Sequence, residues 1–340
     1  MNTQRHRLTG REVWNAASFG SEADWVWQLE PQEIDEMLSA VEQGKAKGLV
    51  PTQFLKSELP MPRIEARMEQ VREELEEGRG FALLRGLPVN KLSDDEARIL
   101  FWGLSMALGV PEEQDASGQV MHSVTNTGLK VEKNNSVRSY QTDDELTFHN
   151  DGGDGFMLLC LRTALSGGVS KLVSVSTIYN EVLRQRPDLL ELLEAPWDFD
   201  TRGQHPHGLQ IQRVPILNFH AEKLSILYKR RYLLLAQEKE EVEKWTQAHH
   251  EAIALIEAIC NDPANQHQFT MKPGDIQIGN NYSVLHSRTK YQDHDDPAQR
   301  RHLLRAWVTL PNGRALPPAF ASAREFAASY ARRHGSLATA

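Results

Sequence analysis

A short histidine–aspartate motif in the middle of the chain constrains the fold more than any other feature. The motif is His149-Asn150-Asp151, and it closes a segment of extended character at residues 145–149. Residues i and i+2 of a strand point to the same side, so His149 and Asp151 can bind one metal ion. Another histidine, His286, follows much later. Two imidazoles and one carboxylate are the ligands of a non-haem Fe(II) site with open positions for oxygen and a cosubstrate. The fold must therefore bring two distant segments together.

Arginines on the last predicted strand fit the same chemistry. Arg301 and Arg305 are four residues apart, so on a strand they share one face. The neighbouring Arg300 then points to the opposite face. A guanidinium binds a carboxylate through two parallel hydrogen bonds, which suits a dicarboxylate cosubstrate held in one pose. The pattern favours Arg301 and Arg305 as the inward-facing pair.

Three other histidine clusters are weaker candidates for a metal site. His294-Asp295-Asp296 lies in a polar stretch that ends at Pro297, which indicates a solvated loop. His205-Pro206-His207 has polar flanks and a central proline, which also favour a loop. His249-His250 lies in a predicted helix, where adjacent residues point apart. A structural role is the simpler interpretation of all three.

The composition narrows the class of protein. The chain has 340 residues, 40% of them hydrophobic and 25% charged, as in a soluble globular protein. Its net charge of −8 and lack of a basic stretch argue against nucleic acid. No apolar run approaches the ~18 residues of a membrane span. We therefore expect a small-molecule substrate, with no nucleic acid or membrane partner. The sequence leaves a homo-oligomer open.

The two cysteines indicate a reducing compartment. Cys160 and Cys260 form neither a disulfide framework nor a zinc motif, so we expect a cytoplasmic location. Cys160 lies in an apolar run, which favours a place in the core over a role as nucleophile.

The hydrophobic pattern predicts one α+β domain over residues 1–340. Residues 1–79 are expected to be mainly helical, 80–312 to form a strand-rich core with a helical insert at about 176–268, and 313–340 to form a tail or helix. Predicted helices cover residues 31–44, 62–78, 93–109, 178–186 and 236–259. Predicted strands cover residues 80–86, 156–161, 171–175, 214–219, 224–228, 269–278, 283–286 and 302–310. The strands at 214–219 and 224–228 are expected to form a hairpin, and Pro273-Gly274-Asp275 a type II turn within 269–278. The helices of 31–78 and the insert are expected to form a lid.

Four segments, taken in order, resemble a known family. They are residues 139–162, 167–170, 280–291 and 301–307. Their order and spacing resemble the Fe(II)/2-oxoglutarate dioxygenases of the TauD/TfdA type, nearer the clavaminate synthase-like branch. The resemblance covers roughly residues 80–312.

The resemblance implies a fold and a set of roles. The fold is a double-stranded β-helix (jelly-roll) core with helices packed outside. His149, Asp151 and His286 would bind Fe(II), and Ser170 and Arg301 would bind 2-oxoglutarate. Such an enzyme uses O2 to oxidise an unactivated C–H bond, usually by hydroxylation, and converts 2-oxoglutarate to succinate and CO2.

The substrate is less constrained than the chemistry. Arg305 near the pocket favours a small anionic or zwitterionic molecule, such as an amino acid, a related carboxylate or a sulfonate. Tyr140, Gln141 and Asn281 are candidate substrate contacts, although hydrogen bonding in turns is the simpler role for each. Desaturation, cyclisation or epoxidation would use the same cofactors. A non-catalytic cupin-like binding protein is the alternative outside this chemistry.

Overall fold

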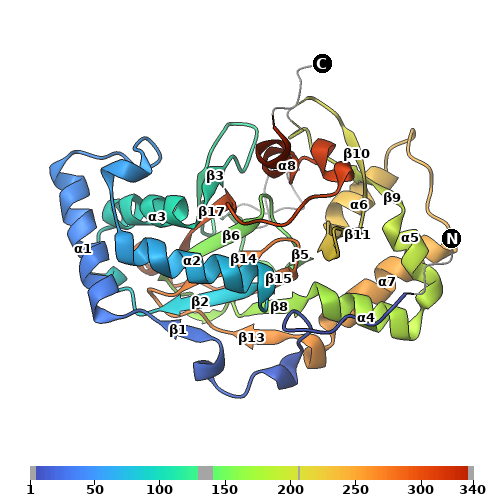
Figure 1. The fold of residues 1–340 in the computed structure, drawn as a ribbon, viewed down its shortest axis with the longest axis horizontal. Coiled ribbons are helices and arrows are strands. Elements are labelled where there is room, and N and C mark those ends of the chain that lie inside the picture. The colour runs from blue at the N-terminus through green and yellow to red at the C-terminus, as the bar shows by residue number, and fades with distance from the viewer. Residues whose placement is uncertain (1–4, 129–140, 206, 336–340) are drawn as a thin grey trace.

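Two facing sheets form the centre of the molecule in the computed structural model, which describes residues 5–128, 141–205 and 207–335. Figure 1 shows helices packed on either side of this strand-rich centre. The larger sheet has the order β1 (Val26–Gln28), β2 (Phe81–Arg85), β14 (Ile276–Asn280), β6 (Gly155–Arg162), β17 (His302–Thr309) and β3 (Val110–Glu112), and β4 (Met121–Val124) also pairs with β17. The smaller sheet has the order β13 (His267–Phe269), β8 (Ser170–Ser174), β15 (Val284–Arg288) and β5 (Leu146–His149).

The alternation of residues along β2 separates two hydrophobic cores. Phe81 and Leu83 share one cluster with Leu172 of β8, so this cluster joins the two sheets. Ala82 and Leu84 belong to a second cluster that includes the N-terminal helices. Because successive side chains of a strand point to opposite faces, β2, β6 and β17 each contribute to both cores.

Three N-terminal helices cover the outer face of the larger sheet, as the sequence predicts. They are α1 (Pro31–Ala46), α2 (Pro62–Glu77) and α3 (Asp94–Leu108). The predicted capping box opens α3: the Ser93 hydroxyl accepts from the backbone N–H of Glu96, and the Glu96 carboxylate accepts from that of Ser93. These helices bury their apolar faces against the outer face of the larger sheet.

The segment between β8 and β13 contains strands as well as helices. Its elements are α4 (Val175–Gln185), α5 (Leu190–Glu194), β9 (Pro196–Asp200), β10 (Ile211–Pro215), β11 (Leu217–His220), β12 (Lys223–Ile226), α6 (Arg230–Gln237) and α7 (Gln247–Asn261). The helical insert predicted at about 176–268 thus also contains the β9–β10 pair, beside the hairpin that the sequence predicts there. The predicted hairpin is confirmed for β11 and β12, whereas Val214 belongs to β10, which pairs with β9.

The long helix predicted for residues 236–259 is confirmed over residues 247–259, which lie in α7, but its first part is interrupted. The chain leaves the helix after Gln237 and starts a new one after Thr246. The side chain of Gln237 accepts from the backbone N–H of Trp245 at 2.9 Å. Thr246 forms a capping box with His249, and the Trp245 ring packs edge-on against Trp197, 5.5 Å between centroids. Capping by histidine in place of Glu or Gln hides this helix start from the usual sequence signals.

The predicted Pro273-Gly274 turn moves the chain from one sheet to the other. β13 lies in the smaller sheet and β14 in the larger one, so residues 269–278 do not form one strand. The backbone N–H of Asp275 donates to the carbonyl of Lys272 at 2.9 Å, and Gly274 has φ +89°. This geometry fits a type II turn, in which glycine tolerates the positive φ. The backbone of Leu87 packs directly against Gly274.

The residues after β17 form two short helical segments. A 3₁₀ segment at Pro318–Ser322 precedes α8 (Ala327–His334). No helix in the described part of the chain is long and apolar enough to cross a membrane. The single-domain organisation over 1–340 stays a prediction.

Replacing Gly274 tests how much this turn contributes to stability. A Cβ atom there would lie 1.9 Å from the carbonyl oxygen of Leu87, in addition to the strain of the positive φ. We expect Gly274→Ala to lower the free energy of unfolding by about 2–4 kcal/mol, measured by urea denaturation. Gly48→Ala is the matched control, because Gly48 also has positive φ but nothing lies within 4 Å of its Cβ position. The control should cost about 1 kcal/mol. Equal losses in both variants would contradict the steric argument.

Candidate metal centre

A cross-strand pair of histidines forms the base of the site. His149 at the end of β5 lies directly opposite His286 on β15, with 4.3 Å between ring centroids. Asp151 follows two residues after His149. Its two carboxylate oxygens lie 3.9 Å from Nε2 of His149 and 3.8 Å from Nε2 of His286. Among the described residues, these three form the one group of histidine, cysteine and acidic side chains with metal-binding spacing.

The donor geometry suits a first-row divalent ion. Taking a metal–ligand distance of ~2.1 Å, two donors on one ion lie at most ~4.2 Å apart. The nitrogen–oxygen distances of 3.8 and 3.9 Å fall inside that limit. Two imidazoles and one carboxylate also match the facial set of non-haem Fe(II) sites. The residues therefore fit Fe(II) on geometry and on donor type.

The protonation states favour metal binding. Nδ1 of His149 lies 2.8 Å from the carbonyl oxygen of Thr147, so it donates there and leaves Nε2 as the metal ligand. Burial lowers the pKa of both His149 and His286, which keeps the imidazoles neutral. Burial alone would raise the pKa of Asp151, but Arg305 and the neighbouring histidines outweigh it and hold that pKa below its usual range.

Two buried asparagines fix the backbone of the ligand loop. The backbone N–H of Asp151 donates to Oδ1 of Asn281 at 3.0 Å, and Nδ2 of Asn281 donates to the carbonyl of Gly152 at 2.7 Å. Nδ2 of Asn150 donates to the carbonyls of Ile226 and Asn281, both at 3.0 Å. Both asparagine side chains are fully buried. They position the ligand and join the β12 end of the insert to the metal centre.

Two glycines let the chain turn immediately after Asp151. Gly153 has φ +70°. A Cβ atom on Gly152 would lie 2.7 Å from the indole ring of Trp307. The ligand loop therefore packs directly against β17.

The face of β17 that carries the arginines points between the two sheets, as the sequence predicts. Leu303 and Trp307 belong to the cluster shared by the sheets, while Leu304 belongs to the cluster behind the larger sheet. Arg301 and Arg305 have the same parity as Leu303, so they face the metal side.

Arg305 lies against the metal-binding carboxylate. Its Nη1 is 3.3 Å from both oxygens of Asp151, and its Nε donates to Oε1 of Gln114 at 2.8 Å. Its guanidinium carbon lies 5.0 Å from the centre of the Trp307 ring. Arg305 therefore lines the pocket beside the metal centre and orients Asp151.

Arg301 lies deeper and is joined by an arginine that the sequence pattern had not singled out. Arg301 and Arg288 are buried, and their guanidinium carbons lie 5.1 and 4.5 Å from the centre of the Tyr291 ring. Burial lowers the pKa of Arg301, and burial together with Arg301 lowers the pKa of Arg288 to about 10. Within the described ranges, Nη1 of Arg301 has no hydrogen-bond partner. Ser170 pairs with Arg288 across β8 and β15. Two buried cations thus meet beside a serine hydroxyl, which is a suitable place for a carboxylate.

Alternation along β15 would have found Arg288. It stands two residues after His286 and so shares the face of the metal ligand. One of its Nη2 hydrogen bonds goes to the carbonyl of Thr142, at 3.1 Å. Arg288 therefore also holds the segment that leads into β5.

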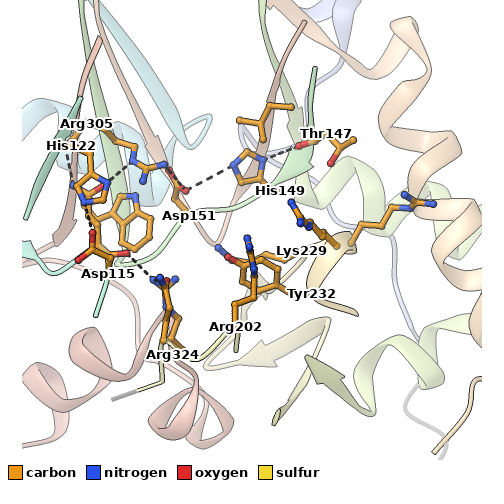
Figure 2. Close-up of a pocket in the computed structure, with 16 residues that line it drawn as sticks. Asp115, His122, Thr147, His149, Asp151, Arg202, Lys229, Tyr232, Arg305 and Arg324 are labelled. Atoms are coloured by element: carbon orange, nitrogen blue, oxygen red, sulfur yellow. Dashed lines mark hydrogen bonds and ion pairs between the residues drawn. The ribbon is translucent and has the colours of Figure 1, made fainter. Parts of the chain in front are cut away.

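A pocket opens beside His149 and Asp151 (Figure 2). The insert contributes much of its wall, including Arg202, Lys229 and Tyr232, as expected for a lid. The helices α1 and α2 contribute none of the lining residues described, because they pack behind the larger sheet. The prediction that they belong to the lid is therefore wrong.

Two of the remaining predicted substrate contacts are absent from the described lining of this pocket. Gln141 and Asn281 are not among its described lining residues, and Tyr140 lies outside the described part of the chain. The histidines at 205 and 207 join no metal-binding group within the described ranges. Cys160 is buried in the core between the sheets, which raises its thiol pKa to about 12, so its predicted structural role is confirmed.

The model of the family described as "Taurine catabolism dioxygenase TauD, TfdA family" matches residues 46–307. The chain belongs to the TauD/TfdA dioxygenase family. This confirms the resemblance seen in the sequence and makes the protein a non-haem oxygenase of that family.

Two relatives of this TauD/TfdA protein match over most of their length. FR-33289 synthase of Streptomyces rubellomurinus is 32% identical over 93% of this chain and 94% of its own. The taurine hydroxylase-like protein SAT17 of Stachybotrys chartarum is 28% identical over 88% of this chain and 79% of its own.

Solved structures confirm the jelly-roll fold. Asparagine oxygenase, in complex with Fe(II), hydroxyasparagine and succinate, has a TM-score of 0.66 at 18% identity and covers 84% of this chain and 93% of that one. The non-haem iron oxygenase OrfP, in complex with Fe and alpha-ketoglutaric acid, has a TM-score of 0.61 at 15% identity and covers 84% and 94%.

Removal of the Asn281 side chain tests the positioning of the ligand loop. Asn281→Ala leaves the Asp151 N–H and the Gly152 carbonyl without their buried partner. We expect a loss of about 2–3 kcal/mol in the free energy of unfolding and about 10-fold weaker Fe(II) binding, measured by urea denaturation and anaerobic titration. Asn261→Ala is the control, since the exposed Asn261 amide bonds to the Glu257 carbonyl of its own helix. Unchanged Fe(II) affinity in Asn281→Ala would rule out the positioning role.

Proposed function

We propose that the protein is an Fe(II)- and 2-oxoglutarate-dependent dioxygenase that hydroxylates an unactivated C–H bond of a small anionic or zwitterionic substrate. In this reaction 2-oxoglutarate is converted to succinate and CO2. The observation that carries the proposal is the position of the His149–Asp151–His286 donor set. It lies between a buried arginine pair on one side and a cation-lined pocket on the other.

The residues divide into three roles. His149, Asp151 and His286 hold the metal on one face, so the opposite positions stay open. Arg301 and Ser170 bind the distal carboxylate of 2-oxoglutarate, with Arg288 adding charge. When bound, Fe(II) and 2-oxoglutarate together supply the oxidising power by activating O2.

Arg301 is suited to its role because a bound carboxylate would offset the free-energy cost of burying its positive charge. A guanidinium buried against Tyr291, with Nη1 lacking a hydrogen bond within the described ranges, gains a charge-assisted partner when a carboxylate binds. Arg305 acts on the other side. It holds Asp151 in place and presents part of its positive surface to the substrate pocket.

The relatives support a small substrate that carries an acid group. One solved relative is named for asparagine, another is in complex with hydroxyarginine, and SAT17 is described as taurine hydroxylase-like. All these molecules carry a carboxylate or a sulfonate. An amino acid or a related acid therefore stays our proposed substrate, and Asp115 in the pocket wall offers a partner for an ammonium group.

We also propose a cytoplasmic location. Both cysteines are free and buried, which suits a reducing compartment. Cell fractionation with an epitope-tagged chain tests this proposal, and recovery in a secreted fraction would contradict it.

Anaerobic titration with Fe(II) and 2-oxoglutarate tests the proposed function. Bidentate binding of the keto acid to Fe(II) produces a weak visible charge-transfer band. We expect this band in the protein and not in His149→Ala. Metal binding without any band would contradict the role of 2-oxoglutarate.

The arginine assignment has a matched control next to it in the chain. Arg301→Gln should weaken 2-oxoglutarate binding by about 30-fold or more while Fe(II) still binds, because a bidentate charge-assisted contact is lost. Arg300→Gln should leave 2-oxoglutarate affinity unchanged, because the exposed Arg300 bonds to carbonyls of its own loop. The charge-transfer band measures both affinities. Equal affinities for the two variants would show that Arg301 is wrongly assigned.

A further inference from the structure

β5, the strand that ends at the metal ligand His149, is weakly paired with its neighbour. His149 lies opposite His286 of β15. The register then shifts, and Leu146 lies opposite Arg288. Such a shift leaves a residue unpaired and interrupts the ladder. The position of β5 matters for the site, because Leu146 and Thr147 line the pocket and the Thr147 carbonyl accepts from Nδ1 of His149 (Figure 2).

Arg288 and Tyr291 hold the chain just before β5. Nη2 of Arg288 donates to the carbonyls of Thr142 and Asp144, the former at 3.1 Å. The carbonyl between them, that of Asp143, accepts from the backbone N–H of Tyr291, also at 3.1 Å. Three successive carbonyls are thus bound by two residues. Because this stretch lies before the first residue of β5, the guanidinium of Arg288 takes the place of strand pairing there.

The same guanidinium also lies at the proposed cosubstrate site. Ser170 is the partner of Arg288 across β8 and β15, so both side chains lie on one face. The guanidinium carbons of Arg288 and Arg301 flank Tyr291, at 4.5 and 5.1 Å from its ring centre. Within the described ranges, Nε of Arg288 and Nη1 of Arg301 have no hydrogen-bond partner. A carboxylate beside Ser170 would offer acceptors to both guanidiniums.

We propose that Arg288 is a positioning residue that couples the binding of 2-oxoglutarate to the order of β5. Its Nη2 keeps the carbonyls of Thr142 and Asp144, while its other N–H groups donate to the distal carboxylate. This inference rests on the proposed function, because it needs 2-oxoglutarate beside Ser170 and Arg301. It goes beyond that function by linking the cosubstrate site to a wall of the pocket and to the strand that carries His149.

The guanidinium group is suited to this coupling because it is planar and rigid. Its five N–H donors form a fixed fork, so an anion that binds one edge also fixes the direction of the other edge. Asp143 and Asp144 attract Arg288, whereas Arg301 repels it. A carboxylate shared with Arg301 offsets that repulsion and holds Arg288 in place. A lysine has the same charge on one nitrogen and cannot hold both edges at once.

Hydrogen exchange with two keto acids tests this role. 2-Oxopentanoate has the five-carbon chain of 2-oxoglutarate, with a methyl group in place of the distal carboxylate. Each keto acid is added to the anaerobic Fe(II) protein until its charge-transfer band is complete. We expect amides 142–149 to exchange at least about 10-fold more slowly with 2-oxoglutarate than with 2-oxopentanoate. Amides of α3, behind the larger sheet, are the internal control and should exchange equally. Equal exchange of amides 142–149 in the two complexes would overturn the proposal.

Arg288→Lys separates position from charge. With saturating 2-oxoglutarate, its amides 142–149 should be protected less than about 3-fold relative to the same variant with Fe(II) alone, because lysine cannot bridge the two sites. Arg184→Gln is the control and should keep the protection of the unmodified protein, since Arg184 lies on α4 and pairs with Glu181. Full protection in Arg288→Lys would show that charge alone suffices and would overturn the positioning role. The comparison of keto acids needs no variant, so it decides the matter even if Arg288→Lys fails to fold.

The two proposals fail in distinguishable ways. Absence of a charge-transfer band with 2-oxoglutarate overturns the proposed cofactor chemistry, and with it this role of Arg288. A complete band without selective protection of amides 142–149 overturns the role of Arg288 alone.

Discussion

The pairing of β5 with β15 is the constraint on which the rest of the site depends. It places His149 opposite His286 and starts the loop that brings Asp151 between them. A slip of one residue in this register would turn one histidine to the outer face of the sheet. The short β5 forms few ladder hydrogen bonds. The hydrogen bonds of two buried asparagines, Asn150 and Asn281, therefore also hold the ligand loop in place.

This arrangement buries positive charge, which is unfavourable for the stability of the fold. Arg288 and Arg301 lie together against Tyr291, and no carboxylate of the described residues lies within ion-pair distance of either one. Such charges destabilise the fold unless an anion joins them. The free energy that ligand binding recovers is then available to order the site. The protein is thus expected to be more stable with its cosubstrate than without it.

The alternation of side chains along a strand predicts most of the metal centre from the sequence. It selects the ligand pair 149 and 151 and the inward faces of Arg301 and Arg305, because strand geometry fixes which residues share a side. It also reaches Arg288, once β15 is anchored on His286. The wall of the pocket is different: Arg202, Lys229 and Arg324, which line it, come from a loop, a helix start and a C-terminal segment, and their meeting depends on tertiary packing. The break before α7 escapes prediction because its cap, Thr246 with His249, is not a common one.

The β9–β10 hairpin that carries Arg202 pairs with neither of the two large sheets. Its residues can therefore be exchanged without altering a single rung of the ladders that position the metal ligands. Lys229 does not have that freedom, because its backbone bridges His149. One side of the pocket can thus change without disturbing the strands that hold the metal ligands, while the other is tied to His149. A designer who wishes to retarget the enzyme would begin at the loop of residues 201–205 and leave Lys229 in place.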